Sequence, residues 1–197
     1  MKEIIIATKN RGKAAEFKTF FSGYGIETKS LLDFDEEMKD IEETGETFEE
    51  NAALKAEQIR DLLSVPVLAD DSGLIIDALN GRPGIFSARY AGEPKSDQAN
   101  IEKVLTELQS IPGEKRTARF ICVLAIAVPG KDTIFKTGYC EGNIGFRVKG
   151  SNGFGYDPIF IPEGYTQTMA QLPANEKNKI SHRKNAIIQL EEWMDNQ

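Results

Sequence analysis

The sequence predicts an α/β fold in which helices flank a mixed β-sheet, and two observations carry this prediction. Residues Thr117–Val128 are apolar at both odd and even positions, a pattern typical of a strand that is covered on both faces. Residues Asp97–Gln109 place their apolar side chains at helical spacing, and similar segments lie near both ends of the chain. Strands that alternate with helices in this way form a sheet wrapped by helices.

The N-terminal part of the chain predicts a strand, a polar loop and a helix. The strand covers Lys2–Ala7, the loop covers Thr8–Lys13, and the helix that follows has an apolar stripe formed by Ala14, Phe17, Phe21 and Tyr24. Ile26–Leu31 predicts a second, more exposed strand. An acidic loop then continues through residues 33–40.

Two more helices and a hairpin complete the predicted order. Thr47 and Glu50 form the capping box of a helix, whose apolar stripe consists of Ala52, Ala56, Ile59 and Leu63. Thr133–Glu141 returns as the hairpin partner of the two-faced strand. Asn175–Lys184 leads a C-terminal helix with an apolar stripe of Ile187, Leu190 and Met194.

The composition limits both the domain organisation and the partners. The chain has 197 residues, enough for a single domain with two lobes, and no linker separates domains within residues 1–197. The formal net charge of −7 argues against a broad basic surface for DNA or RNA. No apolar window approaches the length needed to cross a bilayer, and the N-terminus lacks a signal-peptide pattern. We therefore expect a cytoplasmic protein that binds neither nucleic acid nor membranes.

The two cysteines, Cys122 and Cys140, lie on opposite arms of the predicted hairpin, at positions nearly symmetric about its turn. They could therefore face each other across the ladder. A reduced, buried pair is the better prediction for a cytosolic protein. Neither cysteine has metal-ligand spacing to other Cys or His residues, and the chain has one histidine, so a zinc site is not expected.

The segment Val65–Gly84 places two carboxylates, Asp70 and Asp71, where a short apolar run ends. The sequence predicts that both lie at a strand end, followed by Ser72 and Gly73. Because side chains alternate along a strand, only one of the two carboxylates points into a given pocket if the extended geometry persists. The alternative is a strand-terminating turn, which Asp, Ser and Gly favour.

The loop Thr8–Lys13 has the composition of an anion-binding loop between a strand and a helix. Backbone N–H groups at the helix start, together with Lys9, Arg11 and Lys13, could bind a small anion. The loop is not a Walker A sequence, because the required glycine and lysine spacing is absent. The alternative is an exposed basic turn.

A second loop, Gly150–Pro158, is dense in glycine and carries Phe154, Tyr156 and Asp157. Its two rings either offer a face for a base to stack on or simply cover the core. The start of the C-terminal helix is rich in hydrogen-bond donors, although a lone histidine such as His182 is more often a surface residue.

Seven short motifs follow one another along almost the whole chain. They are Thr8-x-Asn10-x-x-Lys13, Glu42-Glu43-Thr44-Gly45, Phe48-x-x-Asn51-Ala52-x-x-Lys55-Ala56, Ala69-Asp70-Asp71-Ser72-Gly73-Leu74, Gly81-x-Pro83-Gly84-x-x-Ser87-Ala88-Arg89-Tyr90, Gly153-Phe154-Gly155-Tyr156-Asp157-Pro158 and Ser181-His182-Arg183. Each motif is weak evidence alone. In this combination and order, the sequence resembles the Ham1/RdgB-type inosine triphosphate pyrophosphatases.

The resemblance implies a house-cleaning enzyme that uses Mg²⁺ to hydrolyse non-canonical purine nucleoside triphosphates (dITP, ITP and XTP) to the monophosphate and pyrophosphate. It also implies an elongated, two-lobed α/β fold with a long mixed sheet, an active-site cleft between the lobes, and a homodimer. Two rival functions stay open. The last two motifs disfavour a Maf-type pyrophosphatase, and the paired acidic residues disfavour a non-catalytic nucleotide sensor.

By position, the resemblance assigns a role to each site residue. The triphosphate would bind to Thr8, Lys9, Asn10, Arg11, Gly12 and Lys13. Glu42 and Asp71 would bind the metal and Asp71 would also be the proton acceptor, while Glu43 or Glu46 could share the metal. Ser72 would contact the substrate, and the base and ribose pocket would consist of Phe154, Gly155, Tyr156, Asp157, Lys177, His182 and Arg183.

Selection of the base must come from hydrogen bonds. If His182 and Arg183 donate hydrogen bonds to a 6-keto oxygen, hypoxanthine and xanthine fit the pocket. Adenine does not, because its 6-amino group would leave these buried donors unpaired. Guanine also has a 6-keto oxygen, so its rejection requires a further group near its 2-amino group. The sequence does not identify that group.

Overall fold

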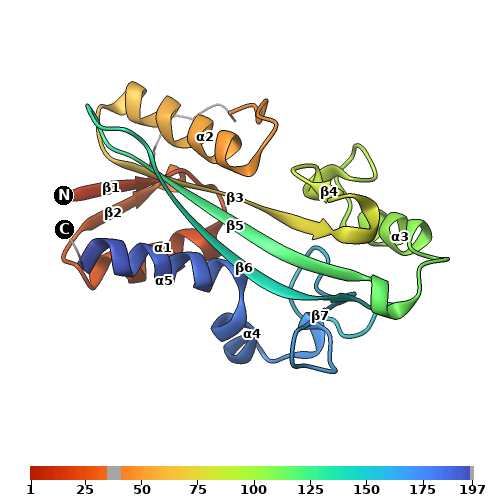
Figure 1. Cartoon of the computed structure of the whole chain (residues 1–197). Helices are drawn as coiled ribbons and strands as arrows, with labels where there is room; N and C mark the ends of the chain where they lie inside the picture. The colour runs from red at the N-terminus through yellow and green to blue at the C-terminus, as the bar shows by residue number, and fades with distance from the viewer. Residues whose placement is uncertain (35–40, 196–197) are drawn as a thin grey trace. The chain divides into compact units, whose positions relative to one another are not determined.

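A computed structural model describes residues 1–34 and 41–195 of the chain (Figure 1). Most of the predicted acidic loop, residues 35–40, lies outside the described residues. In the described part, seven strands form one sheet with the order β2-β1-β3-β5-β6-β7, and β4 pairs with β3. The pairings include parallel and antiparallel strands, and helices flank the sheet (Figure 1). The predicted mixed α/β class is confirmed.

The chain divides into two compact units. Unit 1 consists of Met1–Asp71 and Val123–Lys136, and unit 2 consists of Ser72–Cys122 and Thr137–Gln197. Each boundary falls within a strand: in β3 (Val67–Ile76), β5 (Thr117–Ala127) and β6 (Ile134–Ile144). No irregular linker therefore separates the units, and the single domain across residues 1–197 stays a prediction.

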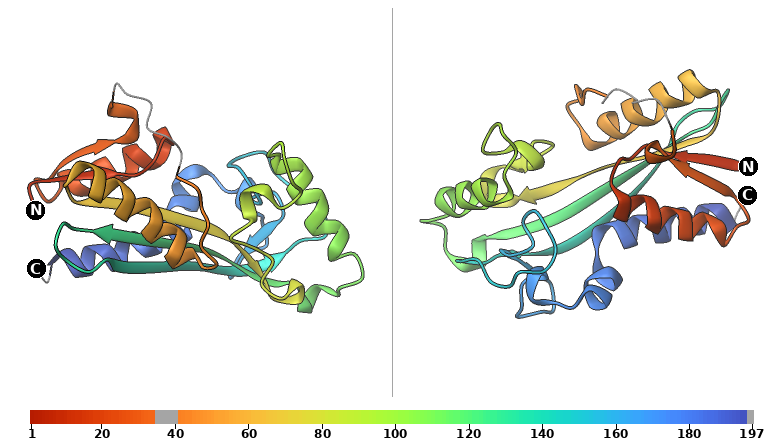
Figure 2. Two further views of the ribbon diagram at one scale, coloured as in Figure 1. Left: turned by 90° about the horizontal axis from the view of Figure 1, so that it is seen from above. Right: turned by 180° about the vertical axis from the view of Figure 1, so that it is seen from behind.

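In unit 1, β1 (Glu3–Ile6) pairs in parallel with β2 (Glu27–Ser30) on one side and with β3 on the other. Helices α1 (Arg11–Ser22) and α2 (Phe48–Leu63) cover opposite faces of these strands (Figures 1 and 2). The apolar stripes predicted for both helices are buried at Ala14, Phe17, Phe21, Ala52, Ala56 and Ile59.

The caps of these two helices follow from their sequences. The Thr47 side chain accepts from the backbone N–H of Glu50, and the Glu50 side chain reaches back, so the predicted capping box is confirmed. At α1, the side chain of Asn10 accepts from the backbone N–H of Lys13 at 3.1 Å. Helix α1 ends at Ser22, so Tyr24 lies beyond it.

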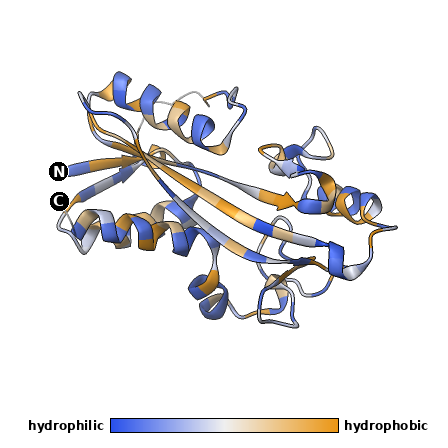
Figure 3. Cartoon of the chain, viewed as in Figure 1, coloured by the Kyte–Doolittle hydropathy of each residue, from blue (hydrophilic) through white to orange (hydrophobic). Residues whose placement is uncertain are grey.

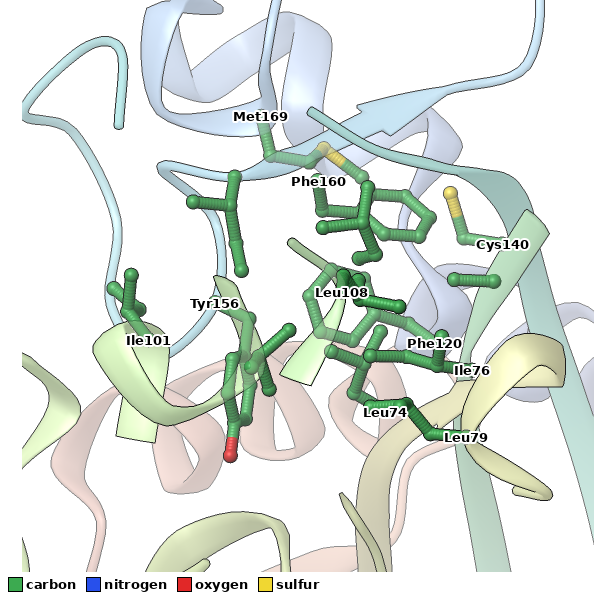
Figure 4. Packing of buried hydrophobic residues seen from close by; sticks show 14 of the residues in the cluster. Leu74, Ile76, Leu79, Ile101, Leu108, Phe120, Cys140, Tyr156, Phe160 and Met169 are labelled. Atoms are coloured by element: carbon green, nitrogen blue, oxygen red, sulfur yellow. The ribbon is translucent and has the colours of Figure 1, made fainter. Parts of the chain in front are cut away.

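In unit 2, β4 (Pro83–Gly84) is antiparallel to β3, and β7 (Phe160–Pro162) is antiparallel to β6. Helix α3 (Asp97–Glu107) contributes to a core of tightly packed apolar side chains, shown in Figure 4, that includes Leu74, Ile76, Ile101, Leu108, Phe120, Tyr156, Phe160 and Met169. Apolar colours dominate β5 in Figure 3, as expected for the two-faced strand.

In the described residues, five short 3-10 turns connect these elements. They cover Leu31–Asp33, Asp77–Leu79, Ser87–Arg89, Gly113–Lys115 and Met169–Gln171. Cys122 and Cys140 are both buried and form no disulfide with each other, as predicted. Among the described residues, no helix is long and apolar enough to cross a membrane.

Two local predictions are wrong. The segment around Asp70 and Asp71 does not end a strand, because β3 continues without a break from Val67 to Ile76. The carboxylates are tolerated in mid-strand since each has a lysine partner. At the C-terminus the donor-rich segment is not simply the start of one long helix.

The C-terminal segment instead forms two helices, α4 (Ala174–Ile180) and α5 (His182–Asp195). They are separated by Ser181, whose backbone is extended (φ −67°, ψ 148°). Its hydroxyl accepts from the backbone N–H of Lys184 at 3.1 Å, which caps the second helix. Polar residues that prefer caps can thus interrupt a helical pattern that periodicity alone would continue.

Candidate active site

Two helices of unit 1 each present a lysine to one of the two carboxylates in the middle of β3. The Lys13 Nζ atom from α1 lies 2.7 Å from Asp70 Oδ2, and the Lys55 Nζ atom from α2 lies 3.4 Å from Asp71 Oδ1. Neighbouring side chains on a strand point to opposite faces, and α1 and α2 lie on opposite faces (Figure 1). The predicted alternation of the two carboxylates is confirmed.

Lys55 also connects β3 to the acidic segment, by which we mean residues 42–45. Its Nζ atom donates to Glu43 Oε1 at 3.0 Å. Both partners are partly shielded from solvent, with 16% of the lysine side chain and 29% of the glutamate side chain exposed. Glu42 and Glu46 are exposed. Of the acidic candidates, Glu43 is therefore the one that shares a lysine with Asp71.

Burial and neighbouring charges shift the pKa values of Asp71 and Lys55. Burial raises the pKa of Asp71, and the nearby charges of Glu43 and Asp70 add to that rise, while Lys55 opposes it. Burial alone would lower the pKa of Lys55, but the charges of Asp71, Glu43 and Asp70 outweigh it and raise this pKa. Because burial disfavours its charged form, the Asp71 carboxylate would gain from a further positive charge beside it.

One oxygen of Asp71 fits a bound cation. Asp71 Oδ2 is buried and accepts no hydrogen bond from the residues described, and such an atom costs about 1–3 kcal/mol when left unsatisfied. In residues 1–34 and 41–195, no three His, Cys, Asp or Glu side chains converge into a ready-made metal cage. A cation held here would therefore keep water or ligand oxygens, which is the habit of Mg²⁺.

The segment Thr8–Lys13 consists of a short loop, Thr8–Asn10, and the first turn of α1, which begins at Arg11, earlier than the sequence predicted. Thr8 is buried, and its hydroxyl accepts from the backbone N–H of Asn10 at 3.1 Å. Lys9, Asn10, Arg11 and Gly12 are exposed, and the first turn of the helix contains no acidic residue. The basic side chains thus lie around the N-terminus of α1, the positive end of the helix, as an anion requires.

In unit 2, the two rings of the turn Gly153–Asp157 have different environments. The Tyr156 ring is buried in the core, its hydroxyl donates to the Ser87 carbonyl at 2.8 Å, and burial raises its pKa. Phe154 is 65% exposed. Each interpretation is therefore right for one ring: Tyr156 covers the core, and Phe154 has an open face.

Asp157 and Asp97 hold this turn in place. The Asp157 carboxylate accepts from the backbone N–H of Phe154 at 2.9 Å and binds Lys177, while Asp97, at the start of α3, accepts from the N–H of Gly155 at 2.7 Å. The Lys177 Nζ atom lies 4.8 Å from the centre of the Phe154 ring. Gly153 has a φ of +80°, and a side chain there would collide with Asp157.

The remaining predicted residues are also placed within unit 2. The His182 ring, at the start of α5, stacks on Phe120 of β5 with ring centres 5.1 Å apart. Both His182 and Arg183 are half-buried, as is Ser72 in β3. The histidine is thus held against the core, and it is not the surface residue that general exposure habits favour.

Sequence reasoning gave no role to three residues that organise these clusters. They are Lys55, which binds two carboxylates, Asn51, which lies one helical turn before it, and Asp97, which holds the glycine-rich turn. A signal for the first two was present, because residues four positions apart share one face of a helix. No local pattern marks Asp97, since its partner is far away in sequence.

The carboxylates and lysines of unit 1 suit a phosphate compound that carries a divalent cation. Comparison with known proteins adds the family: the model of the Ham1 family matches residues 4–193. The chain belongs to the Ham1 family. It is 68% identical to a dITP/XTP pyrophosphatase of Oceanobacillus iheyensis, over 98% of both chains. It is 60% identical to one of Halalkalibacterium halodurans, over 99% of this chain and 100% of the relative.

Solved structures agree with this assignment. The Ham1 protein of Staphylococcus aureus is 47% identical and superposes with a TM-score of 0.90 over 99% of both chains. A HAM1 protein from Coxiella burnetii is 41% identical and has a TM-score of 0.93 over 100% of both chains. The resemblance inferred from the seven motifs is confirmed.

Proposed function

We propose that this chain hydrolyses non-canonical purine nucleoside triphosphates (dITP, ITP and XTP) to the monophosphate and pyrophosphate. The names of its relatives support this function. The observation that carries it is the buried Asp71 carboxylate, which lies beside Lys55 and has one oxygen without a hydrogen-bond partner among the described residues. Such a carboxylate suits a substrate that arrives with a divalent cation.

In the proposed reaction, Asp71 orients a water molecule and takes its proton. The water oxygen forms a bond to the α-phosphorus while the bond from that phosphorus to the bridging oxygen breaks, and pyrophosphate leaves with the electron pair. No covalent enzyme intermediate is needed. The raised pKa of Asp71 suits this role, because a general base works best when its pKa is closer to the operating pH.

Glu42 and Asp71 would hold Mg²⁺, and the buried, unpartnered Oδ2 atom of Asp71 supports its part in this. When bound, the ion would neutralise negative charge on the phosphates. The phosphate oxygens would bind to the N-terminus of α1, to the exposed residues Lys9 and Arg11, and to Lys13. Lys13 already pairs with Asp70, so its ammonium group is held in place before a phosphate arrives.

The base would stack on Phe154, the exposed ring of the glycine-rich turn. Stacking of this kind contributes about 1–3 kcal/mol per base and is tolerant of base identity. Discrimination therefore falls to hydrogen bonds, and we assign the donors for a 6-keto oxygen to His182 and Arg183. Ser72 and Lys177 complete the proposed substrate contacts, with Asp157 and Gly155 shaping the turn.

Three further expectations belong to this proposal. Two buried cysteines that form no disulfide with each other fit a reducing compartment such as the cytoplasm. The net charge of −7 disfavours nucleic acid as a partner. The homodimer that the resemblance implies stays a prediction.

The proposal predicts pyrophosphate release from dITP, ITP and XTP in Mg²⁺, with little release when EDTA removes the metal. ATP should be hydrolysed far more slowly, because its 6-amino group would face the donors of His182 and Arg183. A coupled pyrophosphate assay on the four nucleotides measures both effects. Equal rates on ATP and ITP would contradict the pocket assignment, and binding of dITP without pyrophosphate release would favour a nucleotide sensor.

A further inference from the structure

The acidic segment, residues 42–45, is attached to helix α2 at two points, one helical turn apart. At the first point, Lys55 donates to the Glu43 carboxylate at 3.0 Å. At the second, the Asn51 Oδ1 atom accepts from the backbone N–H of Gly45 at 2.8 Å. Asn51 and Lys55 are four positions apart, so they lie on the same face of the helix.

The second attachment is tightly packed. Asn51 is 1% exposed. A Cβ atom at Gly45 would lie 2.7 Å from the Glu50 Cβ atom and 2.8 Å from Asn51 Oδ1, closer than real Cβ atoms approach. Only glycine therefore lets the segment lie this close to the helix. The position of the backbone next to Glu42 and Glu43 is thus defined by one hydrogen bond and one close approach.

The Asn51 side chain lowers the stability of the protein relative to an apolar residue. Its Nδ2 atom is buried and has no hydrogen-bond partner among the described residues, and an amide left in this state costs about 1–3 kcal/mol. An apolar residue of similar size would avoid that cost. Stability therefore does not explain why an amide stands here. The group that the amide does bind is the backbone of the acidic segment, at Gly45.

We propose that Asn51 is a positioning residue for the metal site: through Gly45 it fixes the acidic segment so that Glu42 presents its carboxylate to the same cation as Asp71. This inference rests on the proposed function, because it takes Glu42 and Asp71 as the metal ligands. Lys55 holds Glu43 in the same segment, so α2 supports the site from two of its residues. Partners of this kind orient metal ligands without touching the metal.

The test measures metal affinity directly. Mn²⁺ binding, followed by electron paramagnetic resonance, is compared between the wild-type protein and Asn51→Ala, each saturated with a non-hydrolysable α,β-methylene analogue of dITP. The dissociation constant for Mn²⁺ should rise about 10-fold in the variant, the low end of the loss seen when an outer-shell partner is removed. The Mg²⁺ concentration for half-maximal pyrophosphate release should rise by the same factor, with kcat at saturating Mg²⁺ largely retained.

Asn100→Ala is the matched control. Asn100 is an equally buried asparagine, 2% exposed, that binds backbone groups of a loop in unit 2: its Oδ1 accepts from Ala91 N–H at 2.7 Å. The control should lose thermal stability without a change in Mn²⁺ affinity. Gly45→Ala disturbs the same attachment from the loop side and leaves α2 intact, so it should weaken Mn²⁺ binding even if Asn51→Ala does not fold.

The outcomes separate this inference from the proposed function. Unchanged Mn²⁺ affinity in Asn51→Ala and in Gly45→Ala, with an active wild-type enzyme, would overturn the positioning role and leave the function standing. A similar loss of affinity in Asn100→Ala would also overturn it, because the effect would then be one of general stability. A wild-type protein that neither binds Mn²⁺ with the analogue nor hydrolyses dITP would overturn the proposed function itself.

Discussion

Replacing Asp71 with asparagine should lower the kcat for dITP hydrolysis by about 100- to 10,000-fold, the range associated with a general base. The amide has nearly the same shape as the carboxylate, but it cannot accept the proton of the attacking water. The affinity for dITP should change much less, because the phosphate and base contacts of the other residues remain. Single-turnover hydrolysis of dITP in Mg²⁺ measures the effect on the chemical step. Binding of dITP in EDTA, where hydrolysis is blocked, measures the effect on affinity.

The same substitution should leave the free energy of unfolding unchanged or raise it. The pKa of Asp71 is raised in the folded protein, so the folded state binds its proton more tightly than the unfolded state does. The stability from this group is present below the ordinary pKa of an aspartate and is lost as pH rises through the folded pKa. At neutral pH the charged carboxylate therefore lowers the free energy of unfolding, and the neutral asparagine removes this loss.

Asp61→Asn is the control for this prediction, because Asp61 is exposed and interacts with Arg60 on the surface of α2. It should change neither kcat nor stability appreciably. If Asp71→Asn keeps normal turnover, Asp71 is not the proton acceptor. If Asp71→Asn unfolds the protein, Asp71 supports the fold. The prediction that the substitution lowers activity while it keeps or raises stability would then be wrong.

Replacing Lys55 with methionine should destabilise the protein by about 3 kcal/mol, the loss expected when one partner of a buried ion pair is removed. The lysine side chain is 16% exposed and binds Glu43 and Asp71, so its removal leaves their charges uncompensated. The loss should shrink at acid pH, starting above the usual range for an aspartate, because the pKa of Asp71 is already raised. Denaturant unfolding at several pH values measures this.

Mg²⁺ should stabilise Lys55→Met more than it stabilises the wild-type protein, because the ion replaces part of the lost positive charge. Lys18→Met provides the comparison: Lys18 pairs with Asp33 at 2.8 Å, but both side chains are well exposed, so its loss should cost less than about 1 kcal/mol. Equal losses in the two variants, or no extra response of Lys55→Met to Mg²⁺, would contradict the role of Lys55 in compensating the charges of Glu43 and Asp71.

Periodicity predicted most of the fold. The apolar stripes of α1 and α2, the capping box at Thr47 and the two-faced strand β5 all follow from local sequence. It failed at β3, because the polar run Asp70–Gly73 resembles a turn. Tertiary contacts reverse that preference: lysines from two helices satisfy the carboxylates, and the strand continues. Local propensity is a weak guide where distant partners neutralise a charge.

The candidate site was predictable in its residue types more than in its contacts. The sequence singled out Asp71, the loop Thr8–Lys13 and the glycine-rich turn, but it could not say which ring of the turn is buried, because both aromatic residues fit either role. The structure separates Phe154 from Tyr156. It also brings Lys55 to Asp71 and Asp97 to Gly155, contacts that depend on how helices pack and that no spacing in the sequence encodes.

The most direct test of the account is to hydrolyse dITP in water labelled with heavy oxygen and to locate the label by mass spectrometry. Attack of an Asp71-activated water at the α-phosphorus places the label in dIMP and leaves pyrophosphate unlabelled. Label in pyrophosphate, or release of inorganic phosphate in its place, would mean that water attacks a different phosphorus and would contradict the proposed reaction.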